Sequence, residues 1–240
     1  YVHMLMQYLG TYSSYDDLLV NPFTGELAKF MSERLGPGDP KYADLDGNYQ
    51  FSRLAYGDFY LGSGIDPDIT GGIYNQFSYK NISLAIQCNY TLGRKALNVS
   101  FADKIRALKG KSGSAVPDLS DIDYYIPASL GNPGNTDALY PGLNPVSGQN
   151  TSIIRQADIF LEDASYFKVR NINLSYRLNA NFLKKLGISS CRFYGVLDNV
   201  LILKKSKNMA DPEAVNGRGW YTGSLYPIAK RYTLGIDISL

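Results

Sequence analysis

Residues 82–92 read Ile-Ser-Leu-Ala-Ile-Gln-Cys-Asn-Tyr-Thr-Leu, so larger apolar side chains alternate with small or polar ones along the whole stretch. Because successive side chains of a β-strand point to opposite faces of a sheet, this pattern predicts a strand with one apolar and one polar face. A helix would instead repeat with a period of about 3.6 residues. The stretch therefore indicates β-structure at the centre of the fold.

The segment immediately before this strand completes a hairpin. Residues 68–79 alternate in the same way, and Lys80-Asn81 separates the two runs. The residues that flank a two-residue turn pair directly and share a face of the sheet. Tyr79 and Ile82 both belong to the apolar set, so the pattern predicts an antiparallel hairpin with its tight turn at Lys80-Asn81.

Further strands are predicted toward both ends of the chain. They cover residues 164–178, 188–203 and 231–240, with a weaker candidate at 2–9. Along 164–178 the apolar face changes parity once, at Arg170-Asn171, as a β-bulge or the exit of the strand from a membrane would cause. In the last run the apolar residues are Tyr232, Leu234, Ile236, Ile238 and Leu240, and they alternate with Arg231, Thr233, Gly235, Asp237 and Ser239.

The connections between these strands alternate between long and short. The long ones are residues 10–67, 93–163 and 204–226, and the short ones are Lys80-Asn81 and 179–187. Compact soluble domains favour connections of about 4–6 residues throughout, whereas outer-membrane barrels combine short periplasmic turns with long external loops. The sequence therefore predicts an all-β fold: an antiparallel transmembrane β-barrel fragment of about six C-terminal strands with long extracellular loops.

Short helices are expected inside the long connections. Leu27, Phe30, Met31 and Leu35 recur at helical spacing before the breaker Gly36-Pro37. Phe101, Ile105 and Leu108 do the same after a cap expected at Ser100.

Composition and charge argue against several classes of protein. The chain has 24 Lys and Arg against 22 Asp and Glu, and no basic run is longer than Lys204-Lys205, so no nucleic-acid partner is expected. His3 is the only histidine, which argues against a Ser-His-Asp triad and a multi-histidine metal site. Cys88 and Cys191 lack ligand spacing and are expected inside strands as small apolar residues, with a disulfide as the alternative.

Two groups of carboxylates have the spacing of candidate sites. Asp44, Asp46 and Asn48 resemble a calcium loop, but Tyr49 stands where a glycine is required and Ala55 where a glutamate is required. A turn rich in Asp, Gly and Asn is therefore expected, and no metal.

Asp211 and Glu213 are spaced like paired carboxylates of a glycoside hydrolase. No second element supports that chemistry, so both are expected in a solvated loop. The prediction is accordingly no catalytic residue, no cofactor and no enzyme activity.

A series of short motifs runs in order through nearly the whole chain. The motifs are Lys41-Tyr42-Ala43-Asp44-Leu45-Asp46-Gly47-Asn48, Asp66-Pro67-Asp68 with Gly71-Gly72, Ser78-Tyr79-Lys80-Asn81-Ile82-Ser83-Leu84, Asp163-Ala164-Ser165-Tyr166-Phe167-Lys168-Val169-Arg170-Asn171-Ile172, Leu183-Lys184-Lys185-Leu186-Gly187-Ile188, Asp198-Asn199-Val200-Leu201, Asp211-Pro212-Glu213, Tyr226-Pro227 and Arg231-Tyr232-Thr233-Leu234-Gly235. Together they resemble the C-terminal region of the SusC/RagA family of TonB-dependent outer-membrane transporters. The chain departs from that family by ending in Leu240 instead of an aromatic residue, and residues 92–154 match nothing specific.

The resemblance implies that residues 1–240 are the C-terminal portion of a large plugged barrel, with the plug domain and the N-terminal strands absent. It also implies import of an oligosaccharide or peptide substrate, a SusD-like surface lipoprotein as partner, and energy from the TonB complex through the absent N-terminal part. The protein is expected to cross the outer membrane of a Gram-negative, Bacteroidetes-like bacterium several times (a multi-pass protein) and to contact the lipid.

The resemblance and the aromatic content of one loop also provide candidate site residues. A barrel assembly signal is expected at Tyr232, Gly235, Ile236, Ile238 and Leu240. Candidate contacts of a loop with ligand or partner are Trp220, Tyr221 and Tyr226, for which anchoring at the membrane interface is the alternative. Arg231, Asp237 and Ser239 are expected to point into the lumen of the barrel.

A second class of protein remains open: a soluble β-sandwich that acts as a carbohydrate-binding or adhesion module. The two readings differ in what the apolar face meets. A barrel turns Ile82, Ile86 and Ile236 toward lipid, whereas a sandwich buries them against a facing sheet.

Overall fold

The computed structural model describes residues 1–52, 56–107, 120–142, 155–178, 183, 187–224 and 228–240. The chain forms two compact units. The first, here called the loop unit, combines Tyr1–Ile65, Ala96–Glu162 and Val215–Ser224. The second, the sheet unit, combines Asp66–Lys95, Asp163–Ala214 and Leu225–Leu240.

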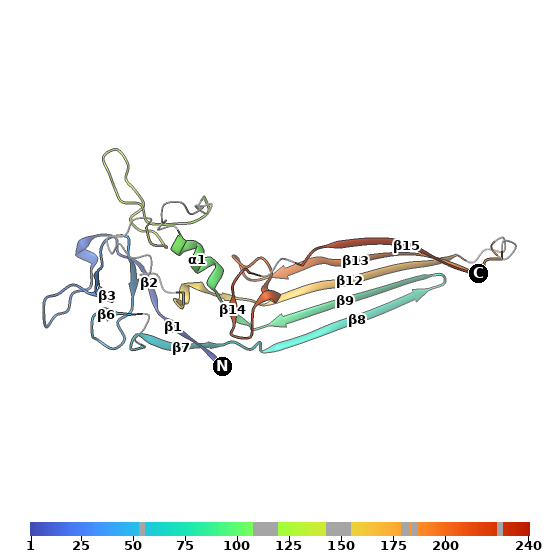
Figure 1. Cartoon of the computed structure of the whole chain (residues 1–240), viewed down its shortest axis with the longest axis horizontal. Coiled ribbons are helices and arrows are strands. Elements are labelled where there is room, and N and C mark those ends of the chain that lie inside the picture. The colour runs from blue at the N-terminus through green and yellow to red at the C-terminus, as the bar shows by residue number, and fades with distance from the viewer. Residues whose placement is uncertain (53–55, 108–119, 143–154, 179–182, 184–186, 225–227) are drawn as a thin grey trace. The chain divides into compact units, whose positions relative to one another are not determined.

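The sheet unit is built on five long antiparallel strands that lie side by side (Figure 1). They are β8 (Ile69–Tyr79), β9 (Ile82–Leu92), β12 (Tyr166–Leu178), β13 (Ser190–Lys204) and β15 (Arg231–Ser239). The order across the sheet is β15-β13-β12-β9-β8, so each long strand pairs with the next long strand of the chain. The described strands form an open sheet with β8 and β15 at its edges.

The predicted alternation of long and short connections is confirmed for the long strands from β8 to β15. Tyr79 pairs with Ile82 across the tight turn at Lys80-Asn81, as the shared apolar face required. The connection from β12 to β13 lies at the same end of the sheet, because the strands are antiparallel. The long connections from β9 to β12 and from β13 to β15 both lie at the opposite end.

The parity change in β12 is a β-bulge. Val169 and Asn171 pair with the consecutive residues Cys88 and Gln87 of β9, so Arg170 is an extra residue there. On the other side of β12 two residues of β13 lie opposite Arg170 alone, since Val169 pairs with Leu201 and Asn171 with Asp198. The predicted bulge is therefore confirmed and affects both neighbouring strands.

The loop unit contains short strands and turns around its own core. Its elements are β1 (Val2–Met6), β2 (Tyr8–Thr11), η1 (Tyr15–Asp17), β3 (Lys29–Phe30), β4 (Glu33–Arg34), β5 (Pro40–Tyr42), β6 (Gln50–Phe51), β7 (Phe59–Gly64), α1 (Val99–Ala107), η2 (Asp158–Phe160) and β14 (Trp220–Tyr221). The strands β10 (Lys95–Asn98) and β11 (Leu161–Asp163) cross the division between the units, and η3 (Pro212–Ala214) belongs to the sheet unit. The core is largely aromatic, with Tyr12, Tyr42, Phe30, Phe51 and Phe160 almost fully buried.

Two expectations for the loop unit are wrong. The strand expected at residues 2–9 divides into β1 and β2 and does not join the long sheet, because β1 pairs with β7. The consecutive residues Leu5 and Met6 are both buried in the core of the loop unit, which an alternating sheet strand would not allow. The described long strands therefore number five instead of six.

The helix expected around residues 27–35 is also absent. Lys29 and Phe30 pair with Arg34 and Glu33 in a short hairpin, and β3 pairs in parallel with β6 as well. Met31 has a φ of +56°, which no α-helix accommodates. Tertiary pairing overrides the helical spacing here.

The second expected helix is confirmed as α1. Its cap is Asn98 instead of Ser100, since the backbone N–H of Phe101 donates to Oδ1 of Asn98 at 3.0 Å. Leu108 lies outside the described residues. Among the helices that the structure describes, none has the length and apolar content that a membrane crossing requires.

Both cysteines lie inside strands, as predicted. Cys88 in β9 and Cys191 in β13 are buried free thiols and form no disulfide. They behave as small apolar residues of the sheet.

Two glycines of the sheet accommodate tyrosine rings of the neighbouring strand. Gly71 pairs with Tyr90 and Gly235 pairs with Tyr194, and a Cβ at either glycine would overlap the partner's ring. The rings therefore lie flat across strand positions that carry no side chain. This arrangement gives Gly235, one of the residues of the expected assembly signal, a packing role.

Gly235→Ala is expected to destabilise the folded protein by about 1–3 kcal/mol, because overpacking forces the Tyr194 ring out of its position. Urea unfolding of the full-length protein in detergent measures the effect. Gly72→Ala is the matched control, since a Cβ there meets the carbonyl oxygen of Cys88 at an ordinary 3.5 Å. The loss should shrink when Tyr194→Ala is added, and an unchanged loss in the double variant would refute the role of the ring.

Candidate functional site

The sheet unit has one apolar face that other described residues leave largely uncovered. Its side chains are Ile69, Ile73, Phe77, Tyr79, Ile82, Leu84, Ile86, Phe167, Val169, Ile172, Leu174, Tyr176, Phe193, Leu197, Leu201, Leu203, Tyr232, Leu234, Ile236 and Ile238. Ile82 is 46% exposed, Ile236 58% and Leu234 90%. Monomeric soluble proteins rarely expose a contiguous apolar surface of this extent. The face is therefore built to meet an apolar environment.

The opposite face carries polar and charged side chains linked across strands. Arg192 of β13 donates through Nε to Asp237 of β15 at 2.9 Å. Arg231 donates to Asp198 at 2.8 Å, and Asn171 donates to the second oxygen of the same carboxylate at 2.8 Å. Arg231 and Asp237 thus lie on the polar face, as the alternation predicted.

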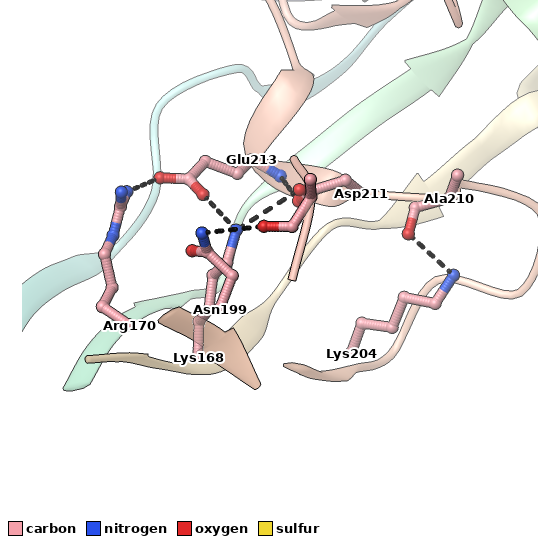
Figure 2. Close-up of polar contacts among 8 residues, drawn as sticks. Lys168, Arg170, Asn199, Lys204, Ala210, Asp211 and Glu213 are labelled. Carbon is pink, nitrogen blue, oxygen red and sulfur yellow. Dashed lines mark hydrogen bonds and ion pairs between the residues drawn. The ribbon is translucent and has the colours of Figure 1, made fainter. Parts of the chain in front are cut away.

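A cluster of ion pairs fixes the connection after β13 to the bulged part of β12 (Figure 2). Nζ of Lys168 lies 2.8 Å from Glu213 and 3.4 Å from Asp211, and the Lys168 side chain is only 4% exposed. Arg170, the extra residue of the bulge, also pairs with Glu213. Lys204 donates to the backbone carbonyl of Ala210 at 3.5 Å. We call these residues the rim cluster.

The rim cluster corrects one expectation. Asp211 and Glu213 do not lie in a solvated loop, because their side chains are 14% and 21% exposed and face Lys168. Both carboxylates pair with cations, and the backbone N–H of Glu213 donates to Asp211 at 3.0 Å. The arrangement stabilises a loop and offers no general acid for glycoside hydrolysis.

The acidic turn of the loop unit brings three carboxylates together. One oxygen each of Asp44, Asp46 and Asp58 lies within 4.8 Å of the others. Backbone N–H groups donate hydrogen bonds to these carboxylates. For example, the N–H of Gly47 donates to Asp44 at 2.9 Å, and the N–H of Tyr49 donates to Asp44 at 3.1 Å. Burial raises the pKa of Asp58 above its usual value. The third member of this group is Asp58, whereas the sequence pattern indicated Asn48. Ala55 lies outside the described residues.

Trp220 lines a cavity of about 490 Å³ in the loop unit. Val2, Met4, Ile65 and Leu97 provide apolar walls, and Arg218 is its one lysine or arginine side chain among the described residues. Tyr221 is 7% exposed and belongs, like Trp220, to β14, which pairs in parallel with β10. Of these two consecutive residues, Trp220 lines the cavity and Tyr221 does not. Tyr226 lies outside the described residues.

The residues of the expected assembly signal occupy the edge strand β15 and its end. Tyr232, Ile236 and Ile238 are 66%, 58% and 59% exposed on the apolar face, Gly235 lies on the polar face, and Leu240 is 93% exposed. Among the described residues, β15 is hydrogen-bonded to β13 alone.

Comparisons with known proteins agree with this fold. TonB-dependent receptor P3 of Formosa agariphila is 28% identical over 212 residues, which cover 84% of this chain and 19% of the receptor. TonB-dependent receptor P39 of the same organism is 26% identical over 221 residues, covering 89% of this chain and 20% of the receptor. Over most of its length the chain is similar to TonB-dependent receptors. It spans about a fifth of the length of these curated relatives.

Solved structures show the same relationship at the level of the fold. The structure of the RagAB peptide transporter matches 99% of this chain and 22% of that chain, with a TM-score of 0.61 and 21% identity. The RagAB peptide importer in its open-open state matches with a TM-score of 0.61 and 22% identity, again over 99% of this chain and 22% of that chain. No protein-family model matches the sequence. The resemblance predicted from the motifs is confirmed, and these TonB-dependent receptors and transporters are not enzymes, as expected.

Proposed function

We propose that this chain is the C-terminal part of an outer-membrane nutrient importer and that its five long strands form part of the wall of a transmembrane β-barrel. The observation that carries the proposal is the uncovered apolar face, which includes Ile82, Leu234 and Ile236. Strands of β9 length, Ile82–Leu92, match the roughly 9–11 residues that a tilted membrane strand needs. Placing all the long connections at one end of the sheet fits a barrel with external loops.

The alternative, a soluble β-sandwich, is disfavoured by the same face. A sandwich requires a second sheet of similar size to cover it. The other sheets among the described residues have two or three short strands. A lipid environment therefore suits the apolar face better than a facing sheet.

The proposed cargo is a peptide or an oligosaccharide, and the proposed partners are a SusD-like surface lipoprotein and the TonB complex. The similarity to TonB-dependent receptors and to the RagAB peptide transporter supports this assignment. In this proposal Trp220 and Tyr221 help to shape a loop surface for ligand or lipoprotein. Tyr232, Gly235, Ile236, Ile238 and Leu240 serve as the assembly signal of the last strand.

Fractionation of source cells tests the location of the full-length protein. We expect it in the outer-membrane fraction, released only by detergent, because the apolar face needs lipid. Under mild detergent it should carry a lipoprotein partner. Growth of cells with and without the gene on defined peptides and glycans then identifies the cargo. Recovery of the full-length protein in the soluble fraction without detergent would contradict the proposal.

A further inference from the structure

The turn that carries Arg218 is closed by hydrogen bonds. It consists of Asn216-Gly217-Arg218-Gly219-Trp220. The side-chain oxygen of Asn216 accepts from the backbone N–H groups of Arg218 and Trp220, at 2.9 and 3.1 Å. The backbone N–H of Asn216 donates to the carbonyl oxygen of Trp220 at 3.0 Å, which closes the turn. Arg218 and Trp220 are therefore held in fixed positions relative to each other.

Gly219 brings this turn into close contact with the rest of the loop unit. Its φ is +73°, and a Cβ there would lie 2.7 Å from the Ile65 side chain and 2.8 Å from the His3 ring. Its carbonyl oxygen accepts a hydrogen bond from the backbone N–H of Leu97 at 2.9 Å. Only glycine combines this backbone conformation with so close an approach. The turn is therefore fixed beside the cavity of about 490 Å³ that Arg218 and Trp220 line.

This cavity combines apolar walls with a single described lysine or arginine side chain. Arg218 is exposed and pairs with no carboxylate among the residues that the structure describes. No described Asp or Glu lines the cavity either. Leu97 is almost fully buried and forms part of the wall, and its cross-strand partner Trp220 adds an indole ring. The guanidinium group of Arg218 therefore faces an apolar space that lacks a described counter-charge.

The lining selects a ligand that carries both an anionic and an apolar group. Guanidinium groups bind carboxylates through paired, charge-assisted hydrogen bonds. Apolar walls favour an aliphatic or aromatic group, because its burial removes apolar surface from water. A neutral oligosaccharide would bury hydroxyl groups against Met4, Ile65 and Leu97, which costs free energy without hydrogen-bond partners. The C-terminal residue of a peptide carries the carboxylate and the apolar side chain on one carbon atom.

We propose that this cavity binds the C-terminal residue of a peptide cargo, with its carboxylate on Arg218 and an apolar side chain against Trp220 and Leu97. The inference rests on the proposed function and chooses between its two cargo classes. The cavity volume lies within the range of about 300–1,000 Å³ that is usual for ligand pockets. An acidic side chain within a longer peptide presents a carboxylate without the apolar group and fits the lining less well.

Binding of two peptide pools to the detergent-purified full-length protein tests the proposal. Both pools contain acetylated hexapeptides with mixed residues followed by a terminal leucine, and one ends in a free carboxylate, the other in an amide. Mass spectrometry of the retained peptides measures the bound fraction. We expect the free-carboxylate pool to bind about tenfold more tightly, since a hydrogen bond to a charged group contributes at least that factor to an equilibrium.

Two variants separate the role of Arg218 from a general effect of charge. Arg218→Gln should remove the preference for the free carboxylate and leave binding of the amide pool unchanged. Arg34→Gln is the matched control, because Arg34 is an exposed arginine of the loop unit that does not line the cavity. This control should keep the full preference. A free-carboxylate pool that ends in serine should bind native protein about tenfold more weakly than the leucine pool.

Three results would overturn the inference. They are equal binding of the carboxylate and amide pools, a preference that Arg218→Gln leaves intact, and displacement of the leucine pool by the neutral oligosaccharide maltohexaose. Because fractionation measures the location separately, any of them in protein from the outer membrane refutes this inference and not the importer. Recovery of the protein in the soluble fraction refutes the importer itself.

Discussion

Lys168→Met is expected to weaken the attachment of the connection between β13 and β15 to the sheet. The closed state of this loop should lose about 3 kcal/mol of stability relative to the open state. Removing one partner of a buried ion pair costs about 3–5 kcal/mol, because it leaves an uncompensated charge. The lower end applies here because Glu213 keeps its contact with Arg170. Methionine fills the volume of the lysine stem, so the variant removes the charge and little packing.

Thermolysin digestion of the folded full-length protein measures this release. The cleavage rate within residues 205–224 follows the population of the open loop and should rise by about two factors of ten. Lys205→Met is the matched control, since its side chain is 70% exposed and its Nζ lies 3.6 Å from Asp163. An exposed pair contributes roughly 0–1 kcal/mol, so that variant should be cleaved at nearly the native rate. Equal rates in the two variants would show that the rim cluster does not hold the loop.

The sequence predicts the long sheet well because the alternation within each strand shows which side chains lie on which face of the sheet. The period of two at Ile82–Leu92 assigns every side chain to a face, and Tyr79 with Ile82 sets the register of the hairpin. Even the irregularity at Arg170 is visible, since an extra residue reverses the parity of the apolar positions. These properties depend on neighbours within one or two strands.

The loop unit is predicted poorly because its structure depends on distant partners. Met6 is fully buried and donates a backbone hydrogen bond to Gln156, which no pattern within residues 2–9 encodes. Phe30 pairs with Phe51 as well as with Glu33, so a helical spacing in one segment yields two short strands. Where such distant pairings determine which residues are buried, the local spacing of apolar residues does not predict the secondary structure.

The rim cluster and the cavity beside Arg218 were missed for a related reason. Lys168 lies in a strand motif and Glu213 in a loop motif, 45 positions further along the chain, and only the fold brings them together. The cavity likewise combines Leu97 and Arg218, which lie far apart in the chain. The aromatic side chain of Trp220 makes it a candidate from the sequence alone, whereas the cavity around it and the ion pairs of the loop required coordinates.

Ile236→Lys is expected to cripple assembly or stability of the full-length protein. Ile236 lies near the middle of β15 (Arg231–Ser239), on the apolar face, and is 58% exposed. In the proposed barrel this position meets lipid close to the midplane, where lysine costs about 2–4 kcal/mol. Ile238 lies nearer the strand end, so Ile238→Lys should cost less, toward about 0–1 kcal/mol at the interface.

Thr233→Lys is the appropriate control for this experiment. Thr233 lies on the polar face of the same strand, opposite Val196, and is exposed. The neighbouring position Asp237 is unsuitable, because its carboxylate pairs with Arg192 and a lysine there would face that arginine. Outer-membrane yield and urea unfolding of the three variants should rank Thr233→Lys closest to native, then Ile238→Lys, then Ile236→Lys. A dependence on face alone, without the dependence on depth, would fit a buried soluble sheet and argue against lipid contact.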